Sequence, residues 1–307
     1  MKRNNQVRQV VFPLLAAFIW GTAFVAQDMC ADVIEPMTFN AARSFIAVII
    51  LLVIICLFRL FRRDKAQPSP EAKKYARRNM LIGGVCCGTA LAVASNFQQA
   101  GITAGTDAGK AGFITALYIV LVPLLGLFLK KRVSLPVWIA VAIAVVALYL
   151  LCIKGEFKLQ TGDLLILLCA FFFAVHILII DHFTQRVDGM KLSCAQFLVC
   201  GILSLIGALI FEHPDLGAIF SVILPILYVG VFSSGVAYTL QILAQKDSNP
   251  TVVTILLSME SVFAVISGAI ILHQSMTPRE YLGCILMLIA VILAQIPFPL
   301  KKKDMII

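Results

Sequence analysis

The feature that most constrains this chain is a succession of ten apolar runs, each about 20 residues long and separated by polar stretches. An α-helix rises about 1.5 Å per residue, so such a run covers the hydrocarbon core of a bilayer, which is about 30 Å thick. Inside that core every backbone amide needs an internal partner, and the runs are about twice as long as the strands of a membrane barrel. The sequence therefore predicts an all-α integral membrane protein.

The ten predicted transmembrane helices form two consecutive groups of five. The first group covers 10–28, 37–58, 79–99, 108–129 and 134–152. The second group covers 163–181, 191–211, 219–241, 251–272 and 279–296. We therefore expect two five-helix units, 10–152 and 163–296.

The composition is that of a chain immersed in lipid rather than in water. Apolar residues make up 61% of the chain and charged residues 13%, against about 25% charged residues in an average soluble domain. A net charge of +9 would suggest nucleic-acid binding in a soluble chain, but here the charges lie between the apolar runs. We therefore expect a lipid bilayer as the surroundings and no nucleic-acid partner.

Lysine and arginine lie mostly on one side of the predicted spans. If the N-terminus is cytoplasmic, 20 of the 25 basic residues fall on the cytoplasmic side, and only Arg43 lies well inside a span. Because positive charge accumulates on that side, the sequence predicts cytoplasmic N- and C-termini and a multi-pass protein of the cell (plasma or inner) membrane. The richest basic stretch, 59–78, is expected to form a loop and a short surface helix against anionic headgroups.

The chain also repeats itself. Residues 14–47 align without gaps on residues 167–200, with identical residues at seven positions. The later spans align at an offset of 142, which pairs Pro136 with Pro278. Each half then holds five spans, and an odd number forces the second half to insert upside down relative to the first. Inverted repeats of this kind are common in secondary transporters, with the binding site near the midplane where the halves meet.

Several stretches resemble the EamA-like branch of the drug/metabolite transporter superfamily. They are Trp20-Gly21-Thr22-Ala23-Phe24, Arg43 in the second span, the stretch from Gln98 to Tyr118, Phe232-Ser233-Ser234-Gly235-Val236-Ala237-Tyr238 and Leu257-Ser258-Met259-Glu260-Ser261-Val262-Phe263. One departure is Ser261, where the family commonly has proline. The resemblance covers nearly the whole chain and implies a ten-helix fold, transport of small molecules and export as its direction.

Glu260 is the residue whose position inside a span most requires a physical explanation. It lies about ten residues, or roughly 15 Å, into its span, which is close to the bilayer midplane. An ionisable group at that depth is costly unless it is paired or solvated. One hypothesis is that Glu260 lines a central cavity, where it contacts substrate or exchanges a proton. The alternative is a structural glutamate that hydrogen-bonds a neighbouring helix.

Ten further residues are candidates for the wall of that cavity, because they place aromatic, amide, hydroxyl or ionisable groups in or beside the spans. They are Tyr118, Trp20, Asn96, Gln98, Gln99, Lys110, His176, Tyr238, Gln241 and Ser258. Tyr118 occupies the position equivalent to Glu260 in the repeat. Amides bind varied polar solutes without requiring one charge. Packing or hydrogen bonding between helices is the alternative for Tyr118, Trp20, His176 and the amides.

Two basic residues in the spans have more than one possible role. Lys110 lies near the outer entrance of its span, where it could attract carboxylate-bearing substrates, pair with an acid or extend to the headgroups. Arg43 lies about seven residues from the outer edge of its span, and its partner in the repeat is Gln196. For Arg43 and Gln196 we expect structural polar roles, with an ion pair or a capped carbonyl group for the arginine; contact with the substrate is the alternative for Arg43.

The sequence offers little support for a metal, a cofactor or an enzyme. Its nine cysteines are scattered, and they lack the spacing with histidine that marks a zinc site. No His-Glu-x-x-His, phosphate-loop or Gly-x-Ser-x-Gly motif is present. We expect none of the three. A membrane-embedded enzyme acting on a lipid-linked substrate is the alternative from another class.

The sequence as a whole predicts a monomeric secondary transporter that alternates access by rocking its two five-helix halves around a midplane cavity. Amino acids or related small metabolites and amphipathic drugs all fit the mixture of amides, hydroxyls and aromatic rings among the candidates. A proton gradient is the expected driving force, although facilitated diffusion would leave the same sequence.

Overall fold

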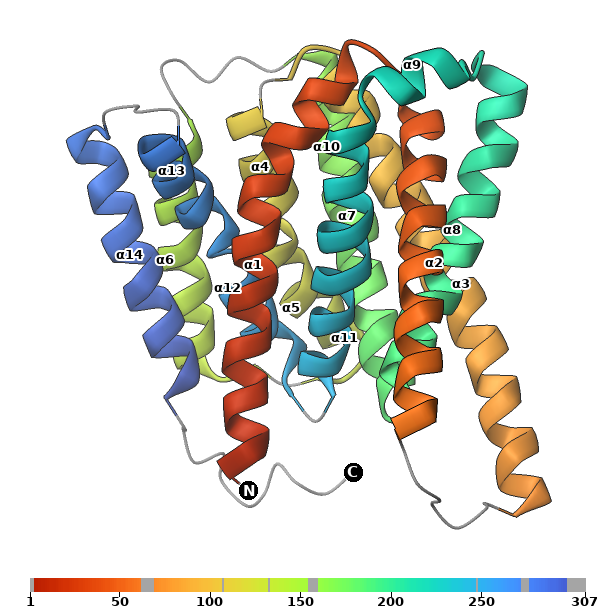
Figure 1. Cartoon of the computed structure of the whole chain (residues 1–307). Helices are drawn as coiled ribbons and strands as arrows, with labels where there is room; N and C mark the ends of the chain where they lie inside the picture. Colours follow the sequence, from red (N-terminus) through yellow and green to blue (C-terminus); the bar gives the residue numbers. More distant parts are fainter. Residues whose placement is uncertain are drawn as a thin grey trace.

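The computed structural model describes residues 3–61, 69–106, 108–131, 133–153, 160–246, 248–271 and 276–296. Within these ranges every regular element is a helix, and the helices form one upright bundle in which α1 begins and α14 ends at the same face (Figure 1). Several of the basic residues that were counted for the orientation lie outside the described residues, at 62–68, 132, 154–159 and 301–303.

The first group of helices spans Arg3 to Cys152. Its members are α1 (Arg3–Ala31), α2 (Pro36–Phe61), α3 (Pro70–Thr103), α4 (Ala108–Ala116), α5 (Tyr118–Phe128) and α6 (Leu135–Cys152). The second group spans Thr161 to Gln295. Its members are α7 (Thr161–Thr184), α8 (Gly189–Phe211), α9 (Leu216–Ser221), α10 (Ile223–Tyr228), the π-helix η1 (Val229–Ala237), α11 (Tyr238–Gln245), α12 (Pro250–Leu257), α13 (Glu260–Ile271) and α14 (Pro278–Gln295).

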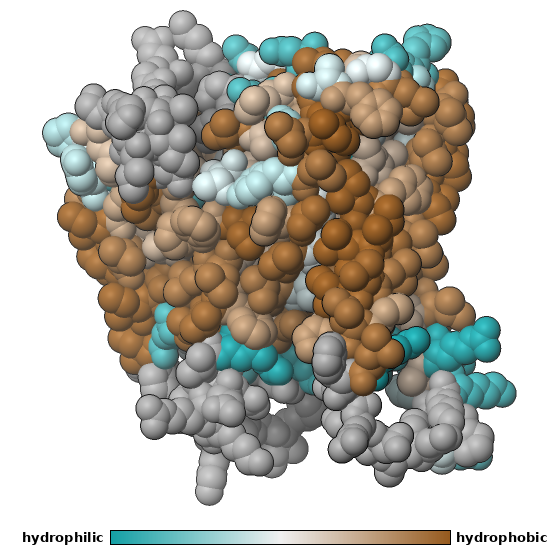
Figure 2. Space-filling model, in the orientation of Figure 1, coloured by the Kyte–Doolittle hydropathy of each residue, from teal (hydrophilic) through white to brown (hydrophobic). Residues whose placement is uncertain are grey.

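The prediction of an all-α membrane protein is confirmed. Among the described residues, nine helical segments are long and apolar enough to cross a bilayer, and a shorter apolar segment covers Pro250–Ile266. Figure 2 shows a broad hydrophobic band across the face in view, with hydrophilic residues gathered near its two ends. Many large apolar side chains of the helices, such as Leu205 and Leu209 of α8, are exposed. Such a surface is stable only against lipid or another apolar partner.

One prediction was wrong in the basic stretch 59–78. The residues that were expected to form a separate surface helix are the beginning of α3, which runs without interruption for 34 residues. At about 1.5 Å per residue this helix is about 50 Å long, so it extends well beyond a hydrocarbon core of about 30 Å. The reason is local: no glycine or proline separates Glu71 from the apolar run, and most of the intervening residues favour helix.

Two of the predicted spans are broken near their middle. The span 108–129 divides into α4 and α5 at Leu117, and the span 251–272 divides into α12 and α13 at Ser258–Met259. At each break the backbone forms a hydrogen bond of the 3₁₀ type, between residues three apart in sequence. Leu117 N donates to Ile114 O at 3.2 Å, and Met259 N donates to Leu256 O at 3.2 Å. The second pieces begin at Tyr118 and Glu260, which are 142 residues apart, the same offset at which the later spans align in the sequence.

The bundle is held together by helix pairs that join the two groups. α2 packs against α8, α3 against α7 and α8, α6 against α14, and α1 against α13. The α3–α7 pair meets at two glycines: a Cβ atom on Gly162 would lie 2.7 Å from Gly101 O, and one on Gly101 would lie 2.8 Å from Gly162 O. Small residues of this kind let helix backbones approach closely where lipid supplies no hydrophobic driving force.

Candidate functional site

A narrow cavity lies between the two groups of helices. Its walls leave about 520 Å³ of empty space, which includes the part that opens outward, but only about 50 Å³ is wide enough to admit the centre of a water molecule. The first group contributes Trp20, Ala23, Phe24, Gln27, Arg43, Gln98, Thr115 and Tyr118. The second group contributes Phe173, Ile177, Ser233, Tyr238, Gln241, Leu257 and Glu260. The arrangement is that of a small-molecule site, with apolar walls and a few convergent polar groups.

Residues that the sequence alignment pairs between the two halves line this cavity together. Trp20 and Phe173 both line it, as do Phe24 and Ile177, and the members of each pair are 153 residues apart. Tyr118 and Glu260, which are 142 residues apart, form a third pair. The third pair differs in chemistry, because the first group contributes a phenol where the second contributes a carboxyl group.

Glu260 is the first residue of α13, where the break in the helix places its side chain at the cavity wall. The residue is 4% exposed. Tyr118 Oη donates a long hydrogen bond of 3.5 Å to Glu260 Oε1. Within the described ranges, no lysine or arginine forms an ion pair with this carboxyl group. A carboxyl group so placed can exist neutral, or it can pair with a cation that enters the cavity.

Arg43, on α2, is the cationic member of the wall. It is 4% exposed, and its guanidinium carbon lies 5.3 Å from the centre of the Phe39 ring. Its Nε is buried without a hydrogen-bond partner, and no described carboxylate pairs with it. Neither the ion pair nor the capped carbonyl group that the sequence suggested is present among the described residues. The cavity thus holds a buried guanidinium that no described carboxylate neutralises.

Trp20 and Tyr238 form the aromatic side of the cavity. Their rings meet edge to face, with centroids 4.9 Å apart. Trp20 Nε1 donates to Ser233 O at 3.4 Å, and Ser233 lies in the π-helix η1. A π-helix displaces carbonyl groups from their usual partners and often occurs at functional sites, so η1 presents this acceptor to the indole. Both rings line the same cavity as Glu260.

Two of the predicted amides also reach the cavity. Gln98 Nε2 donates to Thr115 Oγ1 at 3.1 Å, so α3 and α4 share a hydrogen bond at the wall. Gln241 Oε1 is buried and has no hydrogen-bond partner among the described residues. An unpaired buried acceptor is costly, and a solute or a water molecule that donates to it would remove that cost.

Two of the five predicted residues that lie outside the cavity, Asn96 and Gln99, join helices. Asn96 accepts from Asn40 Nδ2 at 2.9 Å and donates to Ser204 Oγ at 2.9 Å, so it links α2, α3 and α8. Gln99 Nε2 donates to Gln27 O at 3.3 Å. These contacts match the alternative reading of the amides as hydrogen bonds between helices.

His176 and Ser258 are fully buried outside the cavity. His176 Nε2 lies 3.0 Å from Gln196 Oε1, so these two side chains connect α7 and α8. Ser258 Oγ donates to Thr254 O at 2.9 Å, next to the break in the ninth predicted span. This bond competes with the backbone bonds of the helix and helps to end α12.

Lys110 is also outside the cavity, because it pairs with an acid at the start of α7. Its Nζ lies 2.5 Å from Asp163 Oδ2, and the Asp163 side chain is completely buried. Thr106 Oγ1 donates to Asp163 Oδ1 at 3.1 Å, and Gln160 N donates to Oδ2 at 2.7 Å. Asp163 therefore caps the start of α7 and also connects it to α4 through Lys110. Sequence reasoning did not single it out, although its place at the first turn of an apolar run was visible.

Eight residues that line the cavity were not among the predicted site residues. They are Ala23, Phe24, Gln27, Thr115, Phe173, Ile177, Ser233 and Leu257. The repeat could have found Phe173, because it is the equivalent of Trp20. The others carry no signal of their own, since which face of a helix meets the cavity depends on its neighbours. Among the described residues, no group of three or more His, Cys, Asp or Glu side chains could hold a metal ion.

Comparison with known proteins connects this architecture to a family. The family described as the EamA-like transporter family matches residues 8–153 and again residues 160–295. A protein of Archaeoglobus fulgidus named as an uncharacterized transporter is 32% identical over 288 residues, which cover 92% of this chain and 84% of that protein. A solved structure titled only as the crystal structure of a protein has a TM-score of 0.74 at 17% identity, over 94% of this chain and 96% of that one. That last likeness shows the fold alone.

Proposed function

Because this chain belongs to the EamA-like transporter family and is a membrane transporter, we propose that it exports small metabolites through the central cavity by alternating access. Export is inferred from the family resemblance. The cavity lies within a single chain, which supports function as a monomer in the cell (plasma or inner) membrane. The single observation that carries the proposal is the cavity itself, with its buried cation, its carboxyl group and its aromatic wall.

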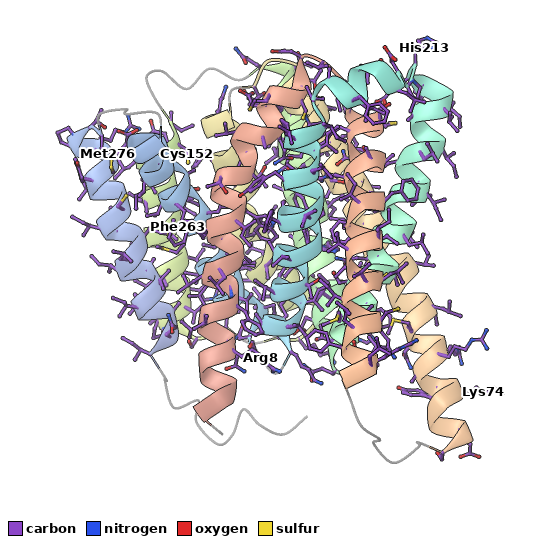
Figure 3. All side chains as sticks on the ribbon, viewed as in Figure 1. Arg8, Lys74, Cys152, His213, Phe263 and Met276 are labelled. Atoms are coloured by element: carbon purple, nitrogen blue, oxygen red, sulfur yellow. The ribbon has the colours of Figure 1, made fainter. Side chains whose placement is uncertain are left out.

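We further propose ten spans arranged as two inverted repeats with cytoplasmic termini. The matched breaks in α4–α5 and α12–α13 support the repeat, as do the separate matches of the family to each half. In Figure 1, α2 and its equivalent α8 run in opposite directions. Arg8 and Lys74 lie at the face where α1 begins, whereas His213 and Met276 lie at the other (Figure 3). The first face would be cytoplasmic by the distribution of positive charge.

The chemistry of the cavity favours solutes that carry a carboxylate and an amino group, as amino acids and related metabolites do. Arg43 offers a guanidinium that no described carboxylate neutralises, and a guanidinium binds carboxylates with strong charged hydrogen bonds. Glu260, when ionised, offers the opposite charge, and Tyr238 and Trp20 offer aromatic surface for an apolar side chain. Amphipathic drugs with the same groups would fit the same walls.

Replacing Arg43 by glutamine should reduce transport of carboxylate-bearing solutes by about 10- to 100-fold, because a hydrogen bond to a charged group is worth about 1.5–3 kcal/mol. Uptake and efflux of a panel of labelled amino acids in proteoliposomes would measure the effect. Arg59→Gln is the matched control, since Arg59 is exposed near the end of the same helix. Equal flux in the two variants would exclude Arg43 as a substrate contact. No flux of any solute by the unmodified protein would contradict transport through this cavity.

Replacing Glu260 by glutamine should abolish the pH dependence of transport, because glutamine keeps the size of the side chain and cannot release a proton. The measurement is the initial rate of efflux from proteoliposomes over a range of pH, with and without an imposed proton gradient. Tyr118→Phe is the matched control: it removes the hydrogen bond to Oε1 and leaves the carboxyl group in place. A Glu260→Gln variant with full pH dependence would remove the proton role and leave facilitated diffusion.

A further inference from the structure

A second cleft lies outside the central cavity, at the end of the bundle where α1 begins. It is formed by the beginning of α3, the connection between α7 and α8, and the end of α11. It contains about 870 Å³ of empty space, including the part that is open to the outside. The side chains that matter here are Arg77, Met80, Arg186, Asp188, Lys191 and Lys246. The cleft exists because α3 continues past the apolar run and supplies one of its walls.

The charge of this cleft is strongly positive. Arg77, Arg186, Lys191 and Lys246 line it with one carboxylate, that of Asp188. Asp188 is occupied as the cap of α8, where its Oδ1 accepts from Lys191 N at 3.1 Å. None of the four basic side chains forms an ion pair with a described residue. Four basic groups that line one cleft without a described acidic partner suit an anion with several oxygen atoms, such as a phosphate group.

Exposed apolar side chains continue from the cleft toward the middle of the bundle. Leu81, one turn along α3 from Arg77 and on the same face, is 61% exposed. Leu198, two turns along α8 from Lys191, is 43% exposed. A free phosphate ion would use only the basic groups. A phospholipid would use both features, because its headgroup carries the phosphate and its acyl chains need an apolar surface directly beside it.

We propose that this cleft binds the headgroup phosphate of an anionic phospholipid, with the acyl chains along Leu81 and Leu198. Basic clefts at the cytoplasmic level of membrane proteins suit such headgroups, and the proposed orientation places this one in the inner leaflet. The site is separate from the central cavity and shares no lining residue with it. A phospholipid bound there would hold the beginning of α3 and the α7–α8 connection at the membrane surface.

The test uses the full chain with its double variant Arg186→Gln/Lys191→Gln, and Arg59→Gln/Lys74→Gln as a control of equal charge outside the cleft. Each protein is incubated with mixed micelles that contain phosphatidylglycerol, and the lipid that remains bound is counted by native mass spectrometry. Each basic group near an anionic lipid contributes about fivefold to affinity, so the cleft variant should bind phosphatidylglycerol about 25-fold more weakly than the unmodified protein. The control should lose much less.

Two further measurements separate the sources of the phosphate group. Phosphatidylcholine, which has no net charge, should be retained equally by all three proteins. Inorganic phosphate should not displace the bound phosphatidylglycerol at millimolar concentration. Equal retention of phosphatidylglycerol by the cleft variant and the control would overturn the proposal. Displacement by phosphate alone would overturn the assignment to a lipid and leave a site for soluble anions.

Discussion

Replacing Asp163 by asparagine should lower the free energy of unfolding by about 3–5 kcal/mol, because removing one partner of a buried ion pair leaves the other charge uncompensated. The Asp163 carboxylate is completely buried and accepts hydrogen bonds from Lys110, Thr106 and the Gln160 backbone. The Lys110 side chain is 11% exposed, so water would replace the lost carboxylate poorly. Unfolding in detergent micelles, followed by denaturant titration, measures the loss.

The matched control is Asp181→Asn at the opposite end of the same helix. Asp181 pairs with Lys131, whose side chain is 34% exposed. Because water already screens that lysine, the expected loss is about 1 kcal/mol or less. Burial also lowers the pKa of Lys131, so part of the attraction is lost to desolvation of the ammonium group. Equal losses in the two variants would show that burial of the Asp163 pair adds nothing to stability.

Replacing Gly21 by alanine should also destabilise the protein, by about 1–3 kcal/mol, although alanine is the better helix former by about 1 kcal/mol. A Cβ atom at Gly21 would lie 2.5 Å from Glu260 O and 2.9 Å from Ala264 N. Both are backbone atoms of α13 and have no side-chain freedom to move away. The helix that carries Glu260 must therefore shift, and we expect transport to fall together with the melting temperature.

Gly112→Ala is the control for this second prediction. Gly112 also lies in a predicted span, but the atoms nearest to its added Cβ would be ring carbons of Phe24 at 4.0 Å. With ordinary contact and a better helix former, this variant should be neutral or slightly more stable. If both alanine variants melt at the same temperature as the unmodified protein, the close approach of α1 to α13 is not rigid.

The membrane helices could be predicted because the length of an apolar run, as a helix, matches the thickness of the hydrocarbon core of a bilayer. The fifth predicted span, 134–152, differs from α6 (Leu135–Cys152) by one residue at its start. The start of α3 could not be found in this way, because hydropathy marks where a helix enters the membrane and not where the helix itself begins. The breaks at Leu117 and Ser258 were missed for a similar reason, since hydropathy says nothing about local hydrogen bonds.

The candidate site was partly predictable because the repeat relates its walls. Tyr118 and Glu260 were paired from the sequence, and their side chains meet in the structure at 3.5 Å. Asn96 and Gln99 were placed in the same cavity, yet they bond to neighbouring helices, because a polar residue in a span shows its depth and not its direction around the helix axis. The acid that pairs with Lys110 could not be chosen from sequence, because it lies 53 residues away.

If access alternates as proposed, the ion pairs at the two ends of α7, above all the buried pair of Asp163, constrain which helices can move apart. Lys110 ties the start of α4 to α7 at one end, and Lys131 ties the chain after α5 to α7 at the other. If the helices of the first group moved as one body against those of the second, α4 and α5 would separate from α7, and at least one of the two ion pairs would break. We therefore expect α4, α5 and α7 to travel together. The group of helices that moves together would then include members of both halves of the sequence.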